Sequence, residues 1–130
     1  MGLTNAGRDF LMEAAIDEST PTFFDNANAY LGVGDDNTAF AVTQTNLQAV
    51  AGSGNAFRKG MEATYPTRAA NALTFRSLFG TSEANYAWEE WGIFNASALG
   101  TMLSRKVESL GTKTSAQSWQ LTATFTLVIA

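Results

Sequence analysis

The segment from Gln117 to Ala130 constrains the fold more than any other part of the sequence. Apolar side chains stand at alternate positions, with Ser, Gln and Thr between them: Trp119, Leu121, Ala123, Phe125, Leu127 and Ile129. This period of two is typical of a β-strand with one buried face and one wet face. At ~3.3 Å per residue it would span roughly 45 Å, more than most small domains need. We therefore expect a β-rich fold in which this strand follows an edge or reaches a neighbour.

The N-terminal segment predicts one amphipathic helix, from about Asn5 to Asp17. Thr4 can cap the free backbone N–H groups of the first turn, and apolar residues recur at helical spacing after it. Pro21 disfavours helical geometry at the residue before it. The helix should therefore end before this proline.

Further strands are predicted by short apolar runs bounded by turn residues: 29–34, 57–65, 72–79, 86–94 and 101–107. The runs 57–65 and 72–79 flank Pro66 and are expected to form an antiparallel pair. The run 86–94 is apolar on both faces, with Tyr86, Trp88 and Phe94 on one side and Trp91 and Ile93 on the other. A strand of this kind should be central and covered twice.

The length of 130 residues suits a single domain, residues 1–130. We predict a mainly β fold: an antiparallel β-sandwich-like domain of six or seven strands with one N-terminal α-helix. The helix occupies about 5–17 and the sandwich about 29–130.

Charged residues make up only 15% of the chain, against about 25% in ordinary soluble domains. Small neutral residues replace them, which predicts a surface partly buried in an assembly. The net charge of −4 argues against a nucleic-acid partner. The two basic dipeptides, Arg58-Lys59 and Arg105-Lys106, are expected at solvated strand positions. No apolar run approaches the ~20 residues of a membrane span, and no signal peptide is evident, so we expect synthesis in a cytoplasm and no membrane partner.

The chain has no cysteine and no histidine, which excludes disulfides, thiolate nucleophiles, imidazole proton shuttles and the usual zinc sites. Glycines and acids at 32–37 lack the spacing of a calcium or phosphate loop and predict a turn. The adjacent carboxylates Glu89 and Glu90 point to opposite faces of a strand and cannot flank one substrate. One is expected at the surface and the other paired with Arg76 or Arg105. We predict no enzyme activity, no cofactor and no metal.

The aromatic residues leave two interpretations open. Aromatic side chains at strand spacing are typical of a core or a subunit interface. An exposed set of Trp and Tyr could instead bind carbohydrate, which would make the chain a host-surface or glycan-binding module.

Several short motifs resemble small tailed-phage structural proteins and the N-terminal attachment domains of phage tail-collar fibres. They are Leu3-Thr4-Asn5-Ala6-Gly7 opening a helix, Tyr30-Leu31-Gly32-Val33-Gly34-Asp35, and Glu90-Trp91-Gly92-Ile93-Phe94-Asn95 followed by Gly100-Thr101-Met102-Leu103. The resemblance implies a non-enzymatic virion component with a β-sandwich-like domain. Tail fibres continue from such a domain into a shaft and a receptor-binding tip, whereas this sequence stops at Ala130. The resemblance therefore implies the attaching domain alone.

From this resemblance we expect a head decoration (cement) protein or a minor tail subunit, located in the virion and made in the host cytoplasm. Its partners would be other copies of itself and the major capsid or tail proteins. The candidate contact residues are Leu3, Trp91, Ile93, Thr122, Thr124, Thr126 and Val128. The sequence leaves head or tail, the oligomeric state and the host open.

Overall fold

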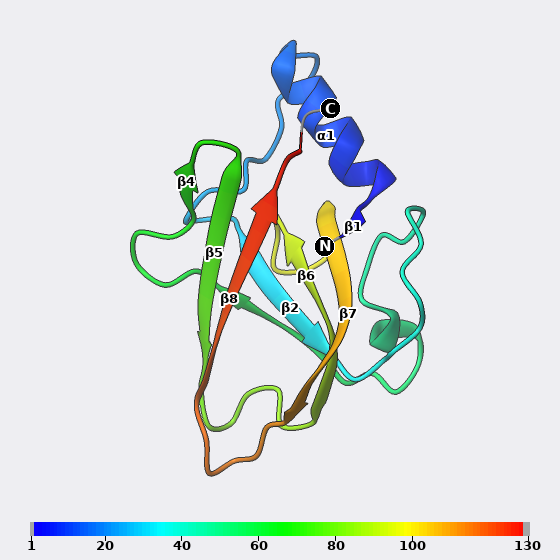
Figure 1. Cartoon of the computed structure of the whole chain (residues 1–130), viewed down its shortest axis with the longest axis vertical. Helices are drawn as coiled ribbons and strands as arrows, with labels where there is room; N and C mark the ends of the chain where they lie inside the picture. Colours follow the sequence, from blue (N-terminus) through cyan, green and yellow to red (C-terminus); the bar gives the residue numbers. More distant parts are fainter. Residues whose placement is uncertain (1, 129–130) are drawn as a thin grey trace.

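The computed structural model describes residues 2–128 and shows two antiparallel sheets and an N-terminal helix, which confirms the predicted mainly β, sandwich-like fold (Figure 1). The larger sheet has the strand order β1-β7-β6-β2-β3 and the smaller one the order β4-β5-β8. The elements are β1 (Gly2–Leu3), α1 (Asn5–Ala15), β2 (Tyr30–Gly34), the 3₁₀ turn η1 (Gln48–Ala51), β3 (Ala56–Gly60), β4 (Thr67–Ala69), β5 (Ala72–Phe79), β6 (Ala87–Phe94), β7 (Met102–Thr112) and β8 (Trp119–Thr126).

The core lies between the two sheets and is built from alternate residues of their inner strands. The smaller sheet contributes Phe75, Phe79, Leu121, Ala123 and Phe125, and the larger sheet contributes Leu31, Val33, Trp88, Trp91, Ile93 and Leu103. The alternation predicted for the last strand is therefore confirmed along β8. Its predicted length is wrong, because β8 ends at Thr126 and its eight residues span only about 26 Å. Residues 129 and 130 lie outside the described residues.

The predicted pairing of 57–65 with 72–79 is also wrong. Strand β3 pairs with β2, and β5 pairs with β4 on one side and β8 on the other. The chain crosses from one sheet to the other between β3 and β4, so strands adjacent in sequence lie in different layers. The actual hairpin is the tight turn between β4 and β5, where Ala70 has φ 52°.

Strand β6 is central, as predicted, because β7 and β2 flank it and both of its faces are buried. Two side chains, Tyr86 and Trp88, lie on the opposite side from the prediction, since both pack in the core that contains Trp91 and Ile93. A register shift between Trp88 and Glu90 places Trp88 in the same core as Trp91 and Ile93, whereas Phe94 packs with Leu47 and Met102 outside it. An extra residue in a strand reverses the facing of all that follow.

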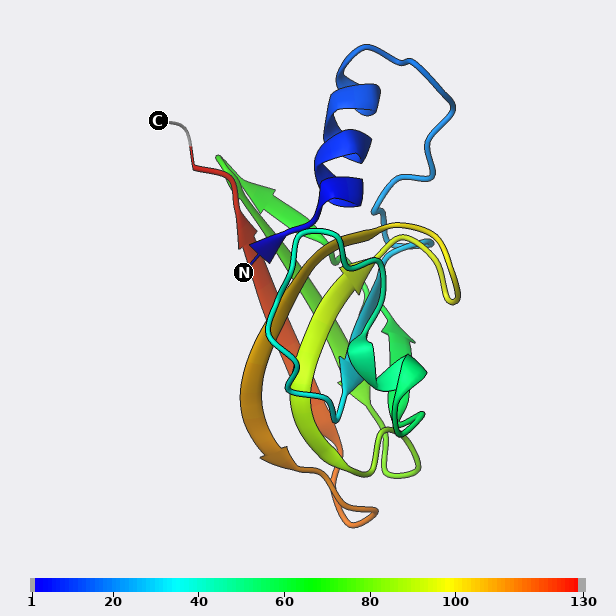
Figure 2. The ribbon, with the colours of Figure 1, turned by 90° about the vertical axis from the view of Figure 1, so that its right-hand side faces the viewer.

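Helix α1 begins where the sequence predicted and stands at one end of the sandwich (Figure 2). The Thr4 hydroxyl accepts the Gly7 N–H at 2.8 Å and donates to the Met102 carbonyl at 2.5 Å. Gly7 lies directly against the Leu103 carbonyl, where a Cβ would collide. The cap and this glycine therefore fix the start of α1 to strand β7. Within residues 2–128, no helix has the length and apolar character needed to cross a membrane.

Candidate functional site

The most distinctive surface is the outer face of the β4-β5-β8 sheet. Cross-strand register places Thr67, Thr74 and Thr124 in one row, and Thr122 opposite Arg76. We call this surface the threonine face; it comprises Thr67, Ala69, Ala72, Thr74, Arg76, Leu78, Gln120, Thr122, Thr124 and Thr126. All of its β8 members are exposed, while their odd-numbered neighbours point into the core.

Only one charged residue belongs to the threonine face, and its charge is locally neutralised. The Arg76 guanidinium donates to Glu62 Oε2 at 2.9 Å and to the Tyr65 hydroxyl at 3.0 Å. Gln120 donates to the same Glu62 oxygen at 2.8 Å. The face thus offers hydroxyl, methyl and amide groups with almost no net charge. A neutral surface of this kind costs less to desolvate than a charged one when it is covered.

The predicted contact residues divide into two groups. Thr122, Thr124, Thr126 and Val128 are exposed, and Leu3 is half-buried in β1. Trp91 and Ile93 are 6% and 0% exposed, so the prediction that they contact another subunit is wrong. Both faces of β6 are already covered by the chain itself, one by the opposite sheet and the other by residues 35–55.

The tryptophans form no exposed platform. Trp88 is 1% exposed and lies edge-to-face with Trp119, 5.0 Å between ring centroids. Its indole N–H donates to the Ala84 carbonyl, and that of Trp91 to Glu108 Oε2. Of the two interpretations left open for these aromatic residues, the positions of the tryptophans fit the core.

The Glu90 carboxylate and the Arg105 guanidinium form an ion pair that is completely buried, 2.8 Å apart. The expected pairing of Glu90 with an arginine is thus confirmed, and the expectation that Arg105 is solvated is wrong. Glu90 also accepts the backbone N–H groups of residues 48 and 49, and Arg105 donates to the Thr38 carbonyl and the Gln44 side chain. The pair therefore fastens the 35–55 segment onto β6 and β7. Glu89, at the register shift in β6, accepts a bond from Ser109.

The dipeptide Arg58-Lys59 is not simply solvated either. The Arg58 guanidinium lies 3.6 Å from the centroid of the Phe94 ring and donates to the carbonyls of residues 96 and 99. Burial lowers its pKa. Lys59 bonds Glu83 at 2.8 Å, which lowers the pKa of that carboxyl. Both cations hold loops in place and are not free for an anionic partner.

The glycine and acid segment at 32–37 forms the end of β2 and the expected turn. Asp35 accepts bonds from Ser53 and Asn55. Asp36 accepts bonds from Thr38, which lower its pKa. These carboxylates anchor their own loop. Across residues 2–128, no cluster of three acids is placed to hold a metal ion.

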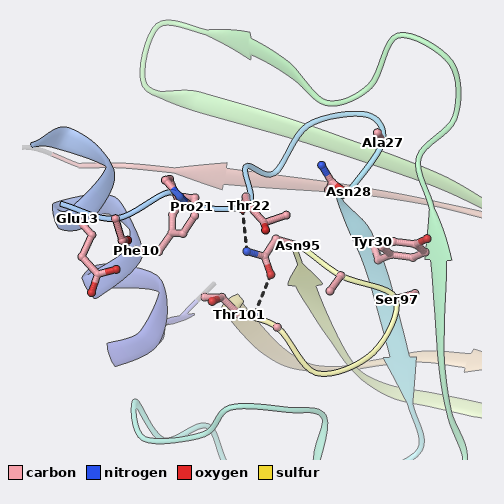
Figure 3. A pocket seen from close by; sticks show the side chains of 13 residues that line it. Phe10, Glu13, Pro21, Thr22, Ala27, Asn28, Tyr30, Asn95, Ser97 and Thr101 are labelled. Carbon is pink, nitrogen blue, oxygen red and sulfur yellow. Dashed lines mark hydrogen bonds between the residues drawn. The ribbon is translucent and has the colours of Figure 1, made fainter. Parts of the chain in front are cut away.

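A hollow of about 480 Å³ lies between α1, residues 16–29 and the loop joining β6 to β7 (Figure 3). Asn95 forms its floor, donating to the Thr22 carbonyl and accepting the Thr101 N–H. Glu13 is the one carboxylate among the lining residues. The hollow therefore lacks the second acid that hydrolysis by paired carboxylates requires.

Two of the threonines in the threonine face, Thr67 and Thr74, were not among the sequence candidates. Alternation in β5 already predicted that Thr74 faces away from Phe75. The sequence did not reveal the register that brings Thr74 beside Thr124, because the pattern of a single strand does not determine which distant strand it pairs with. No protein-family model matches this chain, and no curated protein matches it.

Proposed function

We propose that this chain is a non-enzymatic structural protein of a tailed-phage particle, a head decoration (cement) protein or a minor tail subunit, which docks through its threonine face. The observation that carries the proposal is this face, which spans three strands, is nearly uncharged, and is exposed along β4 and β8 and mostly half-buried along β5. The motif resemblance to phage structural proteins points to the same class. The partners would be the major capsid or tail protein, met in the virion.

The composition of the face favours docking on a protein. Charged residues are depleted from the centres of protein interfaces, because each must be desolvated and re-paired there. Threonine has a short side chain, so ordering it on contact costs less entropy than ordering Lys or Glu. A lattice that binds only the folded subunit is in turn stabilised by it through mass action.

Much of the charge in this chain is used internally. Arg105, Glu90, Arg76, Glu62 and Lys59 all take part in ion pairs that hold loops or strands together. Because these charges pair within the chain, they leave the outer face of the β4-β5-β8 sheet nearly neutral, which favours docking on a protein surface.

Purified particles of the phage that encodes this chain provide the test. The protein should be found in them by mass spectrometry, and particles made without it should rebind the wild-type protein. Thr124→Glu places a charge on the exposed β8 row of the face and should reduce rebinding at least tenfold. Thr43→Glu is the matched control, since Thr43 is exposed on the 35–55 segment, and should bind like wild type. Absence of the protein from purified particles would refute the proposal.

A further inference from the structure

Strand β8 forms an open edge of its sheet. It pairs with β5 and, among the described residues, with no second strand. The Leu127 N–H donates to the Asn71 carbonyl, so odd-numbered residues direct their backbone groups toward β5. In an antiparallel ladder, alternate residues face opposite edges. The N–H and C=O groups of the even-numbered residues from 120 to 126 therefore point away from the sheet.

The other edges of the two sheets are protected in ways that β8 is not. Strand β3 carries Arg58 and Lys59, β4 is three residues long and carries Arg68, and β1 has only two residues. The part of β7 beyond β1 carries Lys106 and Glu108. Charges and short edge strands prevent proteins from pairing edge to edge. Strand β8 has eight residues with no charge and no proline, and so lacks this protection.

We propose that β8 pairs antiparallel with β8 of a second copy of this chain, about a two-fold axis. Residues directly opposite each other in a sheet share a face, so the axis must pass through a residue and not between two. If the axis passes through Thr122 or Ala123, in the middle of β8, nearly all residues of the strand find a partner in the second copy. With the axis at Ala123, Thr122 lies opposite Thr124, a favourable cross-strand pair.

A second copy suits this edge because the strand is neutral. Self-pairing brings identical residues together, and no like charges meet within β8 although each chain carries a net charge of −4. The two threonine faces would join into one continuous surface on the same side of the sheet. A role for the dimer in docking rests on the proposed function. The pairing itself is tested on the isolated protein, so a failure of the dimer and a failure of docking can be told apart.

Sedimentation velocity of the purified chain across a concentration series tests the pairing. An eight-residue edge buries less than a standard interface, so we expect a reversible dimer with a dissociation constant of roughly 10–500 μM. Thr124→Pro removes an outward N–H that the β5 ladder does not use and should raise this constant at least tenfold. If Thr124→Pro fails to fold, Thr122→Lys takes its place in the test. It puts two like charges near the two-fold axis and should also raise the dissociation constant at least tenfold. Thr67→Lys, on the opposite edge of the sheet, should dimerise like wild type.

Introduced cysteines report the register, because the chain has none of its own. Opposed residues of a hydrogen-bonded pair lie ~5.5 Å apart, within disulfide reach. Thr122→Cys should cross-link to itself if the axis passes through Thr122, and to Thr124→Cys in a mixture if it passes through Ala123. Thr74→Cys, one strand further in, should not cross-link.

A wild-type chain that remains monomeric at 1 mM (on the order of the weakest association expected) would overturn the proposal. Dimerisation that survives both Thr124→Pro and Thr122→Lys would overturn it as well. So would a dimer that forms neither of the predicted cross-links.

Discussion

Replacing Arg105 by methionine should destabilise the fold strongly, although methionine fills a similar length of apolar space. The substitution removes the partner of Glu90 while the carboxylate stays completely buried. It also leaves the Thr38 carbonyl and the Gln44 side chain without their donor. Removing one member of a buried ion pair costs about 3–5 kcal/mol. For a domain of this size that corresponds to a fall in Tm of roughly 10–20 °C.

Urea denaturation followed by tryptophan fluorescence measures this change, with two companion variants. Adding Glu90→Gln to Arg105→Met removes the uncompensated charge but keeps an acceptor for only one of the two backbone N–H groups, which bond separate carboxylate oxygens. Since the buried charge is the larger cost, the double variant should still recover about 1–3 kcal/mol. Lys106→Met is the matched control. Its pair with Glu108 is 3.4 Å long and about 40% exposed on each side, and such pairs contribute about 0–1 kcal/mol.

A free energy of unfolding for Arg105→Met within about 1 kcal/mol of wild type would show that the buried ion pair contributes little to stability. A double variant no more stable than the single one would show that the unpaired carboxylate is not the source of the loss. Either result would mean that the buried charge of Glu90 is compensated without Arg105. The ion pair would then not be what fastens the 35–55 segment to β6 and β7.

Three further predictions follow from other contacts. The pKa of Glu83 is lowered from its ordinary value of 4.5, chiefly by the bond from Lys59. The stability that this carboxylate contributes is therefore complete above pH 4.5 and is lost as the pH falls through the lowered pKa. Urea titrations below about pH 4.5 should show a smaller loss of stability with falling pH for Glu83→Gln than for wild type. Gly7→Ala would force a Cβ against the Leu103 carbonyl and should lower Tm by at least about 5 °C by calorimetry, whereas an unchanged Tm would show that α1 can shift. Thr4→Ala loses the helix cap and should cost about 1 kcal/mol and speed hydrogen exchange in the first turn of α1.

The pattern of β8 could be predicted from the sequence because one face of it is core and the other is wet. Its end could not. The alternation continues to Ile129, but strand β5 begins at Ala72, whose partner is Thr126. A strand ends where its partner ends, and the partner's start is set by the turn at residues 70 and 71. The sequence therefore overestimated the length of the strand, which was predicted to extend to Ala130 and ends at Thr126.

Arg105 and Trp91 show why the candidate site was only partly predictable. An arginine in a strand is ordinarily solvated, and the residues that neutralise it lie on β6 and in the 35–55 segment, far away in sequence. That segment has little periodicity, so the sequence did not indicate that it covers the outer face of β6. Trp91 therefore resembled an interface residue. The exposure of the β8 threonines could be predicted because strand alternation alone places them outside, whereas their contact with another subunit stays a prediction.

Electron cryomicroscopy of a particle carrying this subunit can show directly whether the protein docks through the threonine face. The outer face of the β4-β5-β8 sheet should contact the neighbouring protein, with Thr124 inside the contact. The 35–55 segment on the opposite sheet should then face away from the lattice. A map in which Thr124 and its row face solvent while another surface makes the contact would rule out docking through the threonine face.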